Sequence, residues 1–111
     1  MIEARVRDYL TAALTEPVFI DVPAEPPSSY VTVERTGGGE EEHIRSAMIA
    51  LQSYGSSKLE AATLHENVMS LMKAFADRDD ISASDLNSEY DYTDTVTHRY
   101  RYQAVFDIIY Y

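Results

Sequence analysis

One stretch of the chain has the beginning of a metal-binding pattern. His65 and Glu66 lie in a helical segment and start like the HExxH motif, in which two histidines one turn apart bind zinc. Met69 occupies the position of the second histidine. A methionine thioether beside an apolar helical stripe is typical of a packed core, so we expect no zinc site there.

A second stretch resembles the start of a calcium-binding loop. Asp77, Asp79 and Asp80 resemble its beginning, in which the first ligands stand two residues apart. However, Ser82 stands where the sharp turn requires glycine, and Ser88 stands where a bidentate glutamate is required. We therefore interpret the three aspartates as a solvated turn.

Two other features could do chemistry but lack the necessary neighbours. Gly37–Gly39 could approach a phosphate, yet Glu40–Glu42 follow directly and would repel it. His43, His65 and His98 lie in three separate segments, with no spacing that indicates a shared site. The sequence therefore predicts no catalytic residues, no cofactor and no metal, and we expect a protein that is not an enzyme.

Composition narrows the classes of partner. The 111 residues have a net charge of -10 and no cysteine, which excludes disulfides and thiolate sites. Phosphate contacts depend on Lys and Arg, so direct nucleic-acid binding is not expected. The polar start of the chain and the lack of a long apolar run predict one soluble domain over residues 1–111, made in the cytoplasm without a membrane segment.

A long helix over Ser56–Arg78 is the clearest predicted element. Its apolar residues recur every three or four positions, and Ser57 followed by Glu60 has the spacing of a capping box. A second amphipathic helix is predicted from Ile2 to about Leu14, where Pro17 ends it. Both helices need a sheet to cover their apolar sides.

The remaining segments supply that sheet. Strands are predicted at Val18–Val22, at Tyr30–Thr36, within Ile81–Tyr92 and at His98–Tyr111, with a proline-rich loop at Pro23–Ser29. His43–Tyr54 is apolar on both sides, which favours a central strand covered on both faces, although periodicity also permits a helix. The fold class predicted is α+β: a mostly antiparallel sheet of four or five strands, with the long helix on one face and an N-terminal helix.

Two segments are candidates for contacts with other molecules. Three glycines and three adjacent glutamates predict a mobile hairpin loop over Thr36, Gly37, Gly38, Gly39, Glu40, Glu41, Glu42 and His43. The last hairpin is rich in tyrosine, a residue favoured at interfaces. A turn at Thr93–Thr97 would place Tyr90 opposite Tyr100, and the predicted core and interface set is Tyr90, Tyr92, Tyr100 and Tyr102. Simple sheet packing and a spacer hairpin are the alternatives.

The order of these features resembles a known family. A proline-rich loop, the strand ending in Arg35-Thr36-Gly37-Gly38, an apolar strand ending at Gln52-Ser53-Tyr54, a helix with Glu60-Ala61-Ala62 and a tyrosine-rich final hairpin look like the tail terminator, or tail completion, proteins of long-tailed bacteriophages and prophages. The resemblance covers nearly the whole chain.

The resemblance implies a structural role in the virion. Tail terminators form a ring, usually of six subunits, at the head-proximal end of the tail. The ring stops polymerisation of the tail tube protein and presents a docking surface to the head-completion or connector protein. By this resemblance we expect a homo-oligomeric ring, with Thr36–His43 in contact with the tube or a neighbouring subunit.

Two other functions remain open at this point. A neck or head-closure joining protein would share the virion location and small size. An acidic inhibitor that mimics DNA would instead present carboxylates along one exposed face and bind a basic enzyme.

Overall fold

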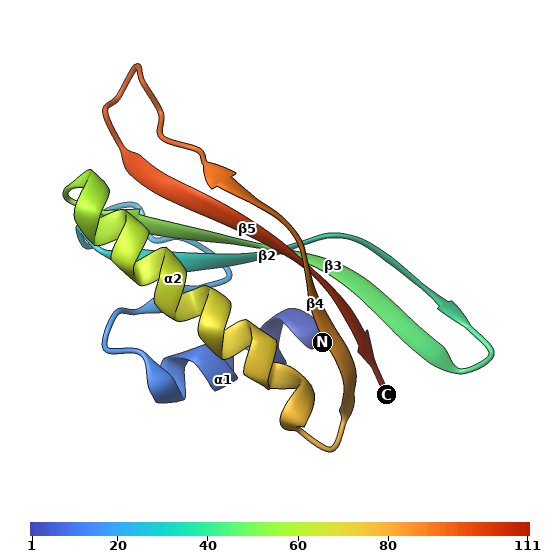
Figure 1. Cartoon of the computed structure of the whole chain (residues 1–111). Helices are drawn as coiled ribbons and strands as arrows, with labels where there is room; N and C mark the ends of the chain where they lie inside the picture. The colour runs from blue at the N-terminus through green and yellow to red at the C-terminus, as the bar shows by residue number, and fades with distance from the viewer.

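The computed structural model describes residues 1–111 as an α+β fold, as predicted. Two helices pack against one five-stranded sheet (Figure 1). The elements follow the predicted order: α1 (Ile2–Ala13), β1 (Val18–Phe19), β2 (Tyr30–Glu41), β3 (Ile44–Gly55), α2 (Lys58–Ala74), a 3-10 turn (Phe75–Asp77), β4 (Ile81–Asp91) and β5 (Tyr100–Tyr110). Neither helix has the length and apolar character needed to cross a membrane.

The strands lie in the order β1-β2-β3-β5-β4. Only β1 and β2 run parallel, and every other neighbouring pair is antiparallel. β3 is paired with β2 on one side and with β5 on the other, from Arg45 opposite Tyr110 to Gly55 opposite Tyr100. The predicted central position of this strand is therefore confirmed.

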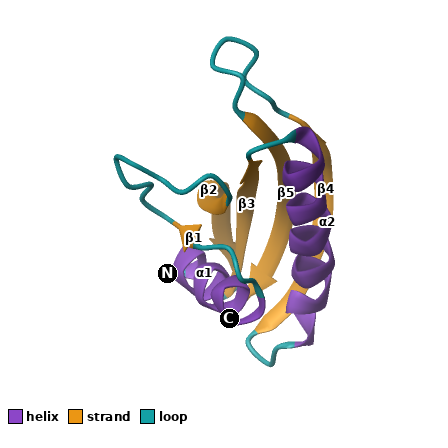
Figure 2. Cartoon of the chain, turned by 90° about the vertical axis from the view of Figure 1, so that its left-hand side faces the viewer, coloured by secondary structure: helices purple, strands orange, loops and turns teal.

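Both helices cover the same face of the sheet (Figure 2). Apolar residues of α1 and α2 join those of the strands in one core cluster, in which Val6, Val68, Ile49 and Phe106 are fully buried. The prediction that β3 is covered on both faces is wrong, because no helix packs on its other side. Met48, which points to that side, is 37% exposed.

The long helix begins as the sequence predicts. The backbone N–H of Glu60 donates to Ser57 Oγ over 3.2 Å, which satisfies one of the free donors of the first turn. The Glu60 carboxylate accepts from the N–H and hydroxyl of Ser56 instead of reaching Ser57. These hydrogen bonds lower the pKa of Glu60, with the Ser56 side chain as the largest cause.

The prediction of a mobile loop over Thr36–His43 is wrong. β2 continues to Glu41, and only Glu42 and His43 form the turn into β3. Both turn residues have positive φ angles, 52° and 69°, as the type I′ turn of a tight hairpin requires. Alternation along the strand directs neighbouring carboxylates to opposite faces, so the glutamates do not crowd one another.

The predicted register of the last hairpin is also wrong. Tyr90 lies opposite Gln103, not Tyr100, and a bridge between Asp94 and Arg99 continues the pairing. The connecting turn is therefore Thr95–His98, further along the chain than predicted. A register difference of three residues reverses the face to which a side chain points, because side chains alternate with a period of two.

Candidate functional site

The far half of the β2–β3 hairpin buries no side chain of its own. We call residues 34–46 the hairpin arm: all are exposed except Gly37, which is half-buried. Figure 1 shows the arm running away from both helices. Its structure depends on the backbone ladder of β2 and β3, with a register shift between Arg35 and Gly37, and β3 is paired with β5 as far as Arg45. The predicted contact residues Thr36–His43 thus lie in an ordered, projecting part of the molecule.

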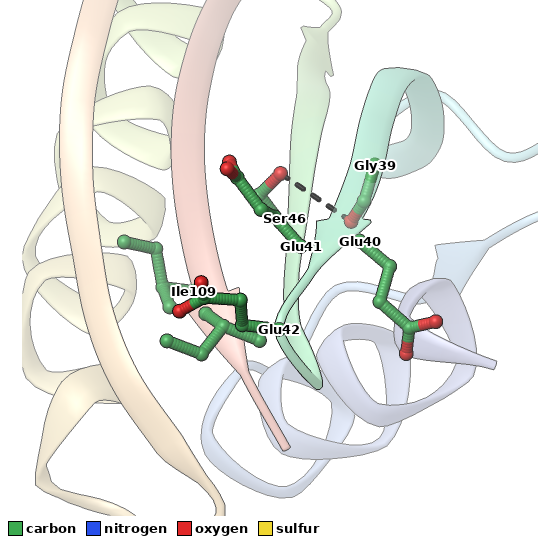
Figure 3. Close-up of a pocket in the computed structure, with 7 residues that line it drawn as sticks. Gly39, Glu40, Glu41, Glu42, Ser46 and Ile109 are labelled. Carbon is green, nitrogen blue, oxygen red and sulfur yellow. Dashed lines mark hydrogen bonds between the residues drawn. The ribbon is translucent and has the colours of Figure 1, made fainter.

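A shallow hollow of about 480 Å³ lies at the tip of the arm (Figure 3). Ile44 and Ile109 give it an apolar part, while Glu41 and Glu42 give it an acidic rim. Glu40 also borders the hollow, but in Figure 3 its side chain points away from Ile109, and its carboxylate accepts from Arg45 Nε over 3.4 Å. The tip therefore offers negative charge beside exposed apolar surface.

Gly38 is required by the close pairing of the arm. Its φ angle is 150°, and a Cβ atom there would lie 2.3 Å from the carbonyl oxygen of Ser46. Nothing lies within 4 Å of a Cβ placed on the next residue, Gly39. The glycines that suggested mobility therefore have different roles, and one of them permits the ladder to form.

A second hollow lies at the opposite end of the sheet. We call it the arginine groove; its lining includes Pro26, Pro27, Tyr30, Tyr54, His98 and Arg99. The rings of Tyr30 and Tyr54 are stacked with centroids 4.4 Å apart. The Arg99 guanidinium lies 5.8 Å from the centre of the Tyr54 ring, at cation–π distance. Burial, followed by the neighbouring Tyr54, raises the pKa of Tyr30.

A chain of side-chain hydrogen bonds crosses the sheet face opposite the helices, which we call the open face. Arg101 donates to the Tyr54 hydroxyl (3.1 Å), which donates to Gln52 Oε1 (2.8 Å). Gln52 Nε2 donates to Gln103 Oε1 (2.8 Å), and Gln103 donates to the hydroxyl of Tyr90. These side chains from three strands restrain one another, so the open face is already ordered before any partner binds.

The four tyrosines predicted as one set are divided between the two faces. Tyr90 and Tyr92 lie on the open face, 42% and 44% exposed, with ring centroids 5.7 Å apart. Tyr102 points toward α2 and stacks on His65 at 5.1 Å. Tyr100 is half-buried and borders the arginine groove. Tyr102 is therefore a packing residue, whereas Tyr90 and Tyr92 are available for contact.

The only group with metal-ligating spacing is His65, Glu66 and Glu89, whose ligand atoms lie within 4.8 Å of one another. His65 is 2% exposed, and its Nε2 lies 3.2 Å from Glu89 Oε1, while its Nδ1 has no hydrogen-bond partner. When the ring proton is on Nε2, it donates to Glu89, and Nδ1 has a free lone pair. A metal bound at Nε2 would require the proton to be on Nδ1 instead. There it would be buried without an acceptor, which is unfavourable. Met69 is in the core, as predicted.

Sequence reasoning predicted contacts for Thr36–His43 in the hairpin arm but gave no indication of the arginine groove. Pro26, Tyr54 and Arg99 are far apart in the sequence, and only the pairing of β3 with β2 and β5 brings them together. The one available signal was the isolated positive charge of Arg99 and Arg101 among the tyrosines of the last hairpin.

Comparisons with known proteins do not assign the chain to a family. A scan against models of protein families and a search of curated proteins each find no match.

Proposed function

We propose that this chain is a tail terminator: a structural subunit that forms a ring at the head-proximal end of a bacteriophage tail, without catalysing a reaction. In the family that the sequence resembles, the ring usually contains six copies. It stops growth of the tail tube and provides the surface to which the head-completion protein docks. The chain is made in the cytoplasm of the bacterial host and ends in the virion.

The main support for this proposal is the exposure of the hairpin arm. Its β3 strand is paired with β5 as far as Arg45, yet none of the arm residues 34–46 is buried. The arm can bury its side chains only when it packs on another molecule, which is the use expected in a protein of assembly. A neighbouring subunit or the tail tube would supply that contact.

Charge is consistent with the same role. Each subunit has a net charge of -10, and a ring of such subunits has a strongly negative field. DNA passing through a ring of this kind would be repelled from its wall instead of adhering to it. This role requires no site for direct nucleic-acid binding.

The proposal is tested by tail length. Electron microscopy of a lysate of the parent phage, with this gene deleted, should show overlong tails of uneven length that are separate from filled heads. Restoring the gene from a plasmid should restore uniform tails. Tails of normal length without heads would indicate a neck or head-closure protein instead, and normal infectious particles would contradict any virion role.

A further inference from the structure

The hairpin tip and the arginine groove lie at opposite ends of β3. This strand begins at Ile44, next to the Glu42–His43 turn, and ends at Gly55, which lines the groove. The molecule is elongated, with extents of 44 × 26 × 25 Å, and Figure 1 shows the two hairpins of the sheet at its two ends. The tip of one copy therefore cannot reach its own groove.

The groove has the chemistry to receive a carboxylate. Arg99 is exposed and forms no ion pair within the chain, while its guanidinium lies beside the Tyr54 ring. The stacked ring of Tyr30 and the prolines Pro26 and Pro27 give the groove rigid apolar walls. A guanidinium held against such walls can form paired hydrogen bonds with a carboxylate.

The hairpin tip has the complementary chemistry. Glu41 and Glu42 are exposed and form no ion pair, whereas Glu40 is already bound to Arg45. Ile44 is 50% exposed beside them and can contact proline and tyrosine side chains. The tip is a tight turn with a fixed backbone, so little ordering is needed when it binds.

We propose that the hairpin tip of one copy binds in the arginine groove of the next copy, with Glu41 and Glu42 facing Arg99. This inference rests on the proposed function, since it supplies the contact between subunits of the ring. Each copy then uses its tip on one neighbour and its groove on the other, which makes the contact heterologous. Its repetition closes a ring when the rotation between copies permits, and otherwise gives a filament.

Cysteine cross-linking tests the contact directly, because the chain has no cysteine of its own. A chain carrying Gly39→Cys beside the tip and Ser28→Cys in the groove keeps both charges and should form a ladder of cross-linked multimers with a short bis-maleimide. A matched chain with Asp79→Cys and Ser28→Cys should cross-link roughly tenfold less, since proximity sets the yield. A ladder equal in the two chains would overturn the proposal, as would the absence of cross-links. Covalent dimers that extend no further would indicate a two-fold contact and overturn it too.

Charge exchange tests the pairing of tip and groove. Glu41→Arg and Arg99→Glu should each weaken self-association by about tenfold or more, and the two changes in one chain should restore it. The controls Asp79→Arg and Lys73→Glu make the same changes of charge at other exposed positions and should have little effect. Analytical ultracentrifugation measures the association, and circular dichroism checks that each variant is folded. Single variants that associate like the wild type would overturn the contact.

These results are independent of the tail-length experiment. A chain that fails to cross-link but whose deletion gives overlong tails would remain a terminator with a different subunit contact. A chain that cross-links through tip and groove but whose deletion leaves tails unchanged would be a self-assembling protein with another role.

Discussion

The two long hairpins of the sheet are held in different ways. The β2–β3 hairpin turns in two residues and projects as an arm that buries nothing, so its order comes from backbone pairing. The β4–β5 hairpin turns in the four residues Thr95–His98, where the Asp94 carboxylate accepts from the backbone N–H groups of Val96 and Thr97. Both hairpins have a backbone ladder, but only the β4–β5 turn has this side-chain support.

The difference explains how a sequence rich in glycine and glutamate becomes a strand. β3 is paired with β5 on its other side as far as Arg45 and Tyr110, so it forms a template for the end of β2. Gly38 allows the close approach of the two strands, and Glu40 is neutralised by Arg45. Local composition favoured a loop, but support from the neighbouring strands outweighed it.

The largest loss in the free energy of unfolding is expected from a substitution at Gly38, in the β2–β3 hairpin. Gly38→Ala places a Cβ atom against the Ser46 carbonyl at a φ angle that alanine rarely adopts, so we expect a loss of about 1–3 kcal/mol. Gly39→Ala, with open space around its Cβ, is the matched control and should change stability by less than about 0.5 kcal/mol. Urea unfolding measures both variants. Hydrogen exchange should show faster exchange in the arm than in β4–β5, and equal effects of the two alanines would contradict the account.

The next effect tests the register of the β4–β5 hairpin. Tyr102→Ala removes a ring that stacks on buried His65 under α2, and we expect a loss of about 1–2 kcal/mol in the free energy of unfolding. Tyr90→Ala changes an exposed ring on the open face and should cost less than about 1 kcal/mol. Thermal and urea unfolding of both variants compare the two positions. A larger loss at Tyr90 would favour the register with Tyr90 opposite Tyr100.

Elements with a regular apolar period were predictable from the sequence, while pairings between distant segments were not. The long helix, its Ser57 cap and the alternating strand that contains Phe106 follow from local patterns, and the structure confirms them. The hairpin arm was misjudged because its order comes from β5, far along the chain. The arginine groove and the His65–Glu89 contact depend on tertiary placement alone, so no spacing in the sequence indicated them.

A smaller effect is expected at the tight turn of the arm. Glu42 and His43 both have positive φ angles, which Asn and Gly adopt more easily. Replacing the pair with Asn-Gly should stabilise the folded chain by about 0.5–1 kcal/mol. The same pair introduced at Thr97 and His98 is the control, since only His98 has a positive φ angle there and little gain is expected. Urea unfolding would contradict the type I′ assignment if the arm variant were less stable than the wild type.

The smallest effect concerns pH and is confined to the β4–β5 turn. The Asp94 carboxylate accepts from the N–H groups of Val96 and Thr97, and these bonds, that of Val96 first, lower the pKa of Asp94. A carboxylate with a lowered folded pKa stabilises the turn above its unfolded pKa, near pH 4, and this contribution is lost as pH falls through the folded value.

Amide exchange of Val96 and Thr97, followed by NMR from pH 6 to pH 2 and corrected for intrinsic rates, should therefore show protection that declines below about pH 4. Asp94→Asn retains an acceptor oxygen but does not titrate, so its protection should vary less with pH. Arm amides such as that of Gly39 depend on the backbone ladder and should not follow the Asp94 titration. An identical pH profile in the wild type and Asp94→Asn would show that another group holds the turn. Asp94 would then no longer distinguish the β4–β5 turn from the hairpin arm.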